Sequence, residues 1–150
     1  MSNMGHEIGS HTHTHRNLAS LQPPEIEHEF RASLEALSKV LGGCEVRGLA
    51  YPFGAFNDAV VSIAKSYFRY GRTMERVNRW NEDIEPYRVG SMGVRHLLKC
   101  PFKALMRKMR LIVLTFHRED LALIRLVIGA LKALDAKILP LGEALERLGI

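Results

Sequence analysis

The chain alternates amphipathic stretches with short apolar runs, and this alternation predicts its secondary structure. Residues 24–41 carry apolar side chains at three- and four-residue steps, begin with proline and acidic residues, and stop at Gly42. That pattern predicts an amphipathic helix with both ends marked. Residues 46–51 predict a short strand, and Asn57 is placed to cap a second helix that runs to Gly71.

The second half of the chain predicts the same alternation after a longer irregular stretch. We expect an irregular connection over 72–95 with a strand near 87–89, a basic helix around 96–109, a strand at 111–116, a helix at 120–134, a strand at 137–139 and a final helix through Leu145 and Leu148. Strands that alternate with helices form parallel sheets covered by helices, so the predicted fold class is α/β.

Length and composition fit one globular domain. The chain has 150 residues, of which 47% are hydrophobic and 25% charged, and these fractions exclude disordered, collagen-like and disulfide-scaffold proteins. No apolar run approaches the roughly 20 residues that a membrane helix needs, so we expect no membrane span. The N-terminus has no basic region followed by an apolar core, so no signal peptide is predicted and the localisation stays unknown.

The formal net charge of +5 leaves a basic interaction module for polyanions as one alternative function. The densest basic cluster lies on or next to the predicted helix at 96–109 and consists of Lys99, Lys103, Arg107, Lys108 and Arg110. No pattern of base-stacking aromatic residues accompanies this cluster. A solvated helix face is therefore the favoured interpretation, and no nucleic-acid partner is expected.

Three segments each follow a predicted strand or a short apolar element and carry a candidate functional group: His11, Phe53 and His117. The carboxyl ends of parallel strands meet on one side of an α/β fold, and functional groups gather there. We therefore expect these three positions to converge on one rim.

His11 and His15 are four residues apart, so in a helical turn they face the same way and can share one metal ion. Neutral imidazole nitrogen suits zinc and similar transition metals. His13 would point elsewhere on such a turn, so no ligand role is assigned to it. Taken alone, the histidine string is equally consistent with a solvent-exposed tract.

Three stretches of the sequence together resemble the polysaccharide deacetylases, also called carbohydrate esterase family 4. They are residues 5–15, residues 50–54 with the sequence Ala-Tyr-Pro-Phe-Gly, and residues 111–117, which end in His117. The resemblance implies an irregular (β/α) barrel and metal-assisted removal of acetyl groups from an acetylated glycan, with N-acetyl as the leading interpretation. Members of this family often act at the cell envelope, and the localisation of this chain stays unknown.

The resemblance implies a role for each candidate residue. His11 and His15 match the two metal-binding histidines of the family's His-Thr-x-x-His motif, so the implied cofactor is zinc or another divalent transition metal. The backbone N–H of Phe53 would contact the oxyanion of the reacting acyl group. His117 would be the general acid, because an imidazole can hold a proton for the leaving amine at neutral pH.

The chain also departs from the family pattern at two places. Many members carry an Arg at the position of Ala50, and Arg47 should face the opposite side of the strand, so it is no substitute. Nothing matches the family's first motif, Thr-Phe-Asp-Asp, which supplies the general base and the third metal ligand. We therefore expect residues 1–150 to form a partial deacetylase domain, an incomplete irregular (β/α) barrel whose first strand and helix are missing.

Two further expectations follow from the missing motif. One alternative function is a catalytically inactive, truncated relative that binds metal or glycan without turnover, because two histidines without a carboxylate bind metal weakly. A barrel without its first strand also leaves an open edge beside apolar side chains. Such an edge invites self-association with another chain.

Overall fold

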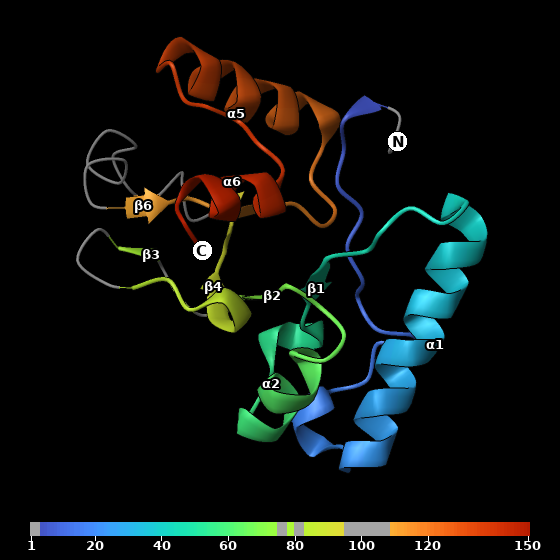
Figure 1. Ribbon diagram of the computed structural model, residues 1–150. Coiled ribbons are helices and arrows are strands. Elements are labelled where there is room, and N and C mark those ends of the chain that lie inside the picture. The colour runs from blue at the N-terminus through green and yellow to red at the C-terminus, as the bar shows by residue number, and fades with distance from the viewer. Residues whose placement is uncertain (1–3, 75–77, 80–82, 95–108) are drawn as a thin grey trace.

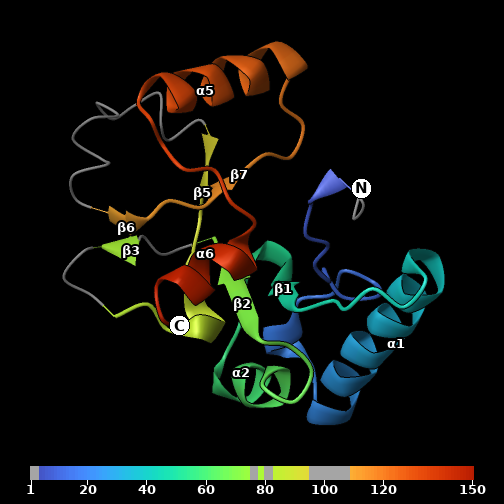
Figure 2. The same cartoon turned by 45° about the horizontal axis from the view of Figure 1, so that its top comes forward.

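The computed structural model describes residues 4–74, 78–79, 83–94 and 109–150. Its helices are α1 (Pro23–Leu41), α2 (Asp58–Ala64), α5 (Leu121–Ala133) and α6 (Leu141–Arg147), with short 3₁₀ turns η2 (Leu18–Ser20), η3 (Pro52–Gly54) and η4 (Pro86–Arg88). Its strands are β1 (Gly48–Ala50), β2 (Tyr70–Thr73), β3 (Asn78–Arg79), β4 (Val89–Gly90), β5 (Met92–Gly93), β6 (Met109–Leu111) and β7 (Leu114–Thr115). Figures 1 and 2 place α1 and α2 at one end of the molecule and α5 at the other.

Parallel strands form the centre of the structure. β1, β2 and β4 pair side by side in that order, all parallel, and β5 pairs in parallel with β7. The N-terminal segment joins β1 through Ser10, whose N–H donates to the Gly48 carbonyl at 2.8 Å and whose carbonyl accepts from Ala50 N–H at 2.8 Å. This pairing puts His11 directly beyond the end of a strand-like segment. The predicted parallel α/β class is confirmed, with an antiparallel β3–β6 pair as an exception.

Helix α1 forms much as its sequence predicts. A capping box between Gln22 and Glu25 holds its N-terminus, and Gly42 ends it in the left-handed conformation at φ 62°. Its apolar face buries Ile26 and Phe30 against the strands and α2. The resulting core cluster consists of Leu18, Leu21, Ile26, Phe30, Leu49, Tyr51, Val60, Ala64 and Phe68.

The second predicted helix is shorter than expected. Asn57 does cap it, accepting from Val60 N–H at 2.9 Å, but α2 ends at Ala64 rather than at Gly71. Phe68 still reaches the core, with its ring 5.2 Å from that of Phe30, but it does so after the chain has turned. The helical spacing was misleading because strand pairing of β2 with β1 outweighs local helix propensity.

Other predicted strands differ in extent. The expected strand near 87–89 is a 3₁₀ turn followed by β4, and the expected strand at 111–116 is divided into β6 and β7. Residues 137–139 form no strand, so that prediction was wrong. They have no strand partner in the described part of the chain. The predicted basic helix lies outside the described residues, apart from Met109, which belongs to β6.

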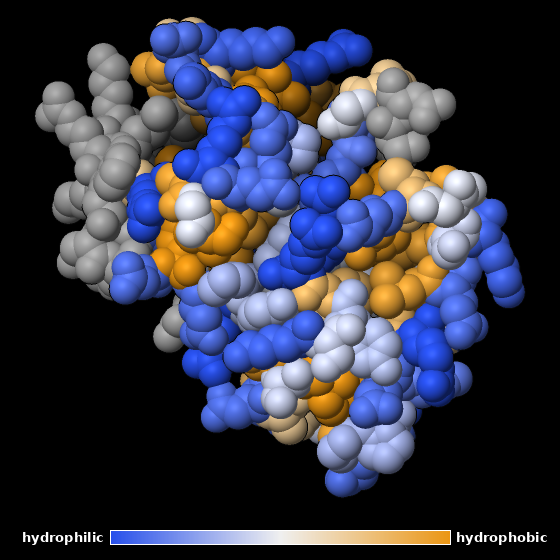
Figure 3. Space-filling model, viewed as in Figure 1, coloured by the Kyte–Doolittle hydropathy of each residue, from blue (hydrophilic) through white to orange (hydrophobic). Residues whose placement is uncertain are grey.

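The C-terminal helices complete the described structure. Asp120 caps α5 by accepting from Ala122 N–H at 3.1 Å, and α6 follows, so both predicted helices are confirmed. Hydrophilic residues cover much of the face seen in Figure 3, with apolar residues between them. Among the described helices, none is both long enough and apolar enough to cross a membrane. The described strands do not close into a barrel.

Candidate functional site

The loop at residues 11–15 brings two imidazoles together. Nε2 of His11 and Nε2 of His15 lie 3.1 Å apart, and their rings meet edge to face. The sequence pattern allowed a helical turn here. The loop is not one, because Thr12 and His15 have positive φ angles of 66° and 59°. These left-handed residues fold the chain back on itself, and so the predicted pairing arises from a different backbone conformation.

Hydroxyl groups hold the inside of this loop. Ser10 Oγ accepts from Thr12 N–H at 3.2 Å, and Thr12 Oγ1 accepts from His15 N–H at 3.1 Å. Ser10 also hydrogen-bonds Ser33 of α1 through their hydroxyls. The short polar side chains therefore fix the positions of both histidines.

Glu29 of α1 holds the loop from the other side, and the sequence reasoning missed it. Its carboxylate accepts from the backbone N–H groups of His13 at 3.0 Å and Thr14 at 2.8 Å, and from the Thr14 hydroxyl. Glu29 is 3% exposed. Burial by itself raises the pKa of Glu29, but the hydrogen bonds from Thr14 and His13 outweigh it and leave that pKa below its ordinary value. A glutamate on the apolar stripe of α1, beside Ile26 and Phe30, was the signal available in the sequence.

The two histidines suit a metal ion. Nδ1 of His11 lies 2.7 Å from the Ala50 carbonyl oxygen, so it donates there and leaves Nε2 with its lone pair facing His15. Burial lowers the pKa of His11, against the hydrogen bond to Ala50, and favours the neutral form that binds metal. Two nitrogen ligands of tetrahedral zinc are about 3.3 Å apart, close to the 3.1 Å between these atoms.

The described residues offer no third ligand. No group of three His, Cys, Asp or Glu side chains within residues 4–74, 78–79, 83–94 and 109–150 is arranged to hold a metal ion. His13 points away, as predicted, with its ring 6.5 Å from that of His28. The site is therefore a two-histidine arrangement in this part of the chain.

Phe53 and His117, the other two predicted site residues, differ in how they relate to the histidine pair. The Phe53 ring is 4.8 Å from the His15 ring, and Phe53 is 67% exposed with a φ of 59° in turn η3. His117 follows β7, is exposed, and is close enough for its charge to lower the pKa of His11. The rim thus gathers residues from three separate segments.

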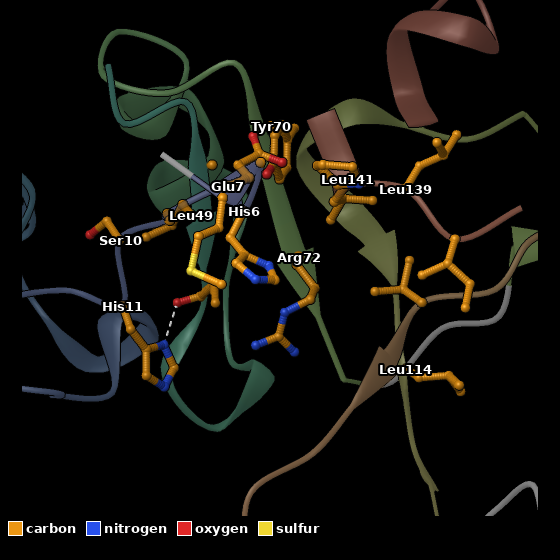
Figure 4. Close-up of a pocket in the computed structure, with 18 residues that line it drawn as sticks. His6, Glu7, Ser10, His11, Leu49, Tyr70, Arg72, Leu114, Leu139 and Leu141 are labelled. Carbon is orange, nitrogen blue, oxygen red and sulfur yellow. Dashed lines mark hydrogen bonds between the residues drawn. The ribbon is translucent and has the colours of Figure 1, made fainter. Parts of the chain in front are cut away.

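A cavity of about 740 Å³ opens beside His11. It lies between the N-terminal segment and residues 138–141, with β1 and β2 behind it. The carboxylate of Glu7 spans the two sides, accepting from Gly142 N–H at 2.8 Å. Figure 4 shows His6 and Arg72 pointing into the space between His11 and Leu114.

Arg72 is a second residue that sequence reasoning missed. It stands on β2 opposite Ala50, the position where many members of the family carry an Arg. Arg47, which the sequence predicts to face the opposite side of the strand, pairs with Glu45 at 2.9 Å and Glu146 at 3.2 Å. The pairing of β2 with β1 brings Arg72 to this position. The sequence does not predict that pairing, because the spacing of apolar residues up to Gly71 predicts a helix.

Comparison with known proteins shows which family this chain resembles. The profile described as polysaccharide deacetylase matches residues 1–69, the part that contains His11, His15 and Phe53. The chain is also 29% identical over 147 residues to a chitooligosaccharide deacetylase of Azorhizobium caulinodans, covering 91% of this chain and 68% of that protein. The chain is thus similar to the polysaccharide deacetylase family, most clearly over residues 1–69. His117 lies outside the matched range.

Two further similarities bear on the family and the fold of this chain. A gellan lyase of a Bacillus species is 34% identical over 91 residues, which are 61% of this chain and 4% of that protein. A carbohydrate esterase family 4 domain of a multidomain xylanase, from the hindgut metagenome of Trinervitermes trinervoides, superposes with a TM-score of 0.67 at 19% identity. That superposition covers 99% of this chain and 68% of the domain and confirms that the two share a fold, although the described strands of this chain form no closed barrel.

Proposed function

We propose that this polysaccharide deacetylase domain, residues 1–150, removes acetyl groups from a glycan by metal-assisted hydrolysis, acting on N-acetyl groups. The observation that carries the proposal is the His11–His15 pair, whose Nε2 atoms lie 3.1 Å apart on a loop held by Glu29. Such a pair, anchored through His11 Nδ1 and flanked by Phe53, is the arrangement expected of a metal-binding rim.

Each residue contributes a separate step to the proposed reaction. His11 and His15 would hold zinc or another divalent transition metal, which supplies Lewis-acid polarisation of the acetyl carbonyl and of a water molecule. The Phe53 N–H would donate to the oxyanion as the water oxygen bonds to the acetyl carbon. A carboxylate of the Thr-Phe-Asp-Asp motif, acting as general base, would take the proton that the water loses. When the carbon–nitrogen bond breaks, His117 would give its proton to the leaving amine, and acetate and a free amino sugar result.

One competing function has an observation in its favour. The described residues include no third ligand and no carboxylate assigned as general base, which favours an inactive relative that binds metal or glycan without turnover. The basic cluster that suggested a polyanion-binding module lies, except for Arg110, outside the described residues. The experiment below separates the first two functions.

The test is to fuse a strand and helix carrying Thr-Phe-Asp-Asp ahead of Met1 and to measure acetate release from acetylated chito-oligosaccharides. The added carboxylates would supply the proposed base and third ligand beside His11, His15, Phe53 and His117. We expect metal-dependent acetate release from the fusion and none from the original chain. Chelation of the metal should abolish the activity of the fusion.

A matched variant of the fusion tests the assigned acid. His117→Ala should keep its zinc and lose most of its rate, because general acid catalysis contributes on the order of a hundred- to ten-thousand-fold. Arg118→Ala, an exposed neighbour, should leave the rate within about twofold. A fusion that folds and binds zinc but shows no turnover dependent on His117 would refute the mechanism.

A further inference from the structure

Helix α1 carries neither of the proposed metal ligands, yet two of its buried polar side chains reach the loop that does. Glu29 and Ser33 are four residues apart, so they lie one turn apart on the same face of the helix. Both are 3% exposed. Polar side chains buried this deeply need hydrogen-bond partners, and both find them in residues 10–14.

Ser33 begins a chain of hydrogen bonds that ends at His15. Its hydroxyl meets that of Ser10. Ser10 Oγ accepts from Thr12 N–H at 3.2 Å, and Thr12 Oγ1 accepts from His15 N–H at 3.1 Å. A hydroxyl oxygen that accepts from Thr12 still has its own proton to donate, and Ser33 Oγ is the acceptor beside it. Ser33 therefore keeps the Ser10 hydroxyl turned toward Thr12.

The two imidazoles are anchored to different elements. His11 is tied to strand β1, because its Nδ1 lies 2.7 Å from the Ala50 carbonyl oxygen. The end of the loop that carries His15 is tied to α1, because Glu29 accepts from the N–H of the preceding Thr14 at 2.8 Å. The 3.1 Å between the two Nε2 atoms thus depends on how α1 sits against β1.

We propose that Ser33 and Glu29 are positioning residues that couple α1 to the metal site. A metal ion shared by His11 and His15 then links the helix to strand β1. Linkage is reciprocal, so the free energy by which α1 strengthens metal binding is the free energy by which bound metal stabilises α1. The proposal rests on the proposed function only in taking His11 and His15 as metal ligands.

The first test needs no variant to show the coupling. Hydrogen exchange of the full chain is followed with and without zinc, because amides of a helix exchange when it opens locally. Zinc should slow the α1 amides of residues 29–33 more than those of α5, which lies at the other end of the molecule (Figure 1). Equal slowing of the two helices, or slowing confined to residues 10–15, would overturn the coupling. In His11→Ala the effect on α1 should disappear.

Variants of α1 then assign the coupling to its two side chains. Calorimetry should show zinc affinity about tenfold lower in Ser33→Ala and in Glu29→Gln, a loss typical of groups that orient metal ligands. Ser38→Ala and Glu27→Gln change exposed positions of the same helix and should stay within about twofold. Adding Ser33→Ala to Ser10→Ala should cost nothing more, because the chain of hydrogen bonds is already broken. Unchanged zinc affinity in a folded Ser33→Ala chain would overturn the role of Ser33.

A metal-free measurement separates positioning from the proposed reaction. The rings of His11 and His15 have centroids 4.6 Å apart and should give a nuclear Overhauser effect between them. This effect should persist in Ser38→Ala and weaken in Ser33→Ala, and an unchanged effect in folded Ser33→Ala would overturn the positioning role. If the Thr-Phe-Asp-Asp fusion releases no acetate while Ser33→Ala still lowers zinc affinity, the proposed function fails and the positioning role stands.

Discussion

Glu29 Oε2 lies 2.8 Å from the backbone nitrogen of Thr14, although 15 residues separate them in the sequence. This contact ties the middle of α1 to the loop that carries His11 and His15. A buried carboxylate that accepts several hydrogen bonds is costly to disturb, because each donor left behind has no water to replace it. The geometry of the histidine pair therefore depends on a residue that touches neither imidazole.

Glu29→Ala should destabilise the chain by about 2–4 kcal/mol, because it leaves two backbone N–H groups and the Thr14 hydroxyl without their acceptor. Urea denaturation followed by circular dichroism measures the change. Glu27→Ala, an exposed position on the same helix, is the control and should cost less than about 0.5 kcal/mol. Equal losses in the two variants would mean that the loop contacts contribute nothing beyond helix propensity.

Stability should also depend on pH through Glu29. Its pKa in the folded chain is below its ordinary value of 4.5, so the carboxylate stabilises the fold above that pH. As the pH falls below about 4.5, the unfolded chain takes up this proton first and the stabilisation is lost progressively. Thermal melts between pH 7 and pH 3 should show a flatter acid dependence in Glu29→Gln. Parallel curves for the two proteins would argue against this linkage.

Phe53 offers a test of backbone strain at the rim. Its φ of 59° is a left-handed conformation that costs a non-glycine residue roughly 1 kcal/mol. Phe53→Gly and Phe53→Ala both remove the exposed ring, but only glycine relieves the strain. The glycine variant should be the more stable of the two by about 1 kcal/mol in chemical denaturation. An alanine variant of equal or greater stability would mean that the turn is relaxed.

Self-association is expected from the unpaired C-terminal segment. Residues 137–139 have no strand partner in the described structure, and Ile138 is 53% exposed beside the cavity. An unpaired segment with exposed apolar side chains favours pairing with another chain. Analytical ultracentrifugation should show oligomers that Ile138→Lys reduces, while Val40→Lys, at another exposed apolar position, leaves them unchanged. A monomer at all concentrations would contradict this expectation.

The sequence predicted elements best where local signals and tertiary packing agree. Helix α1 has a proline start, a capping box and a left-handed Gly42, and α5 has Asp120 as its cap, so both appear close to the predicted bounds. The second helix was overextended because Phe68 keeps helical spacing with Ala64 while the chain turns into a strand. Local periodicity cannot show a strand that forms only by pairing with a distant one.

The sequence indicates the candidate site residues but not the residues that contact them from other elements. His11, Phe53 and His117 could be placed on one rim because each follows a strand-like segment. Glu29 and Arg72 could not, because their importance comes from contacts across 15 and 43 residues, to Thr14 and to Thr115. A buried glutamate and a partly buried arginine look like surface residues until the neighbouring element is known.

The most direct measurement is a calorimetric zinc titration of the chain and its three single histidine variants. If His11 and His15 share one site on a loop held by Glu29, His11→Ala and His15→Ala should each weaken zinc binding at least tenfold. His13→Ala should change it less than threefold, because the His13 ring points toward His28. Equal loss in all three variants would instead show a generic histidine tract and contradict the account.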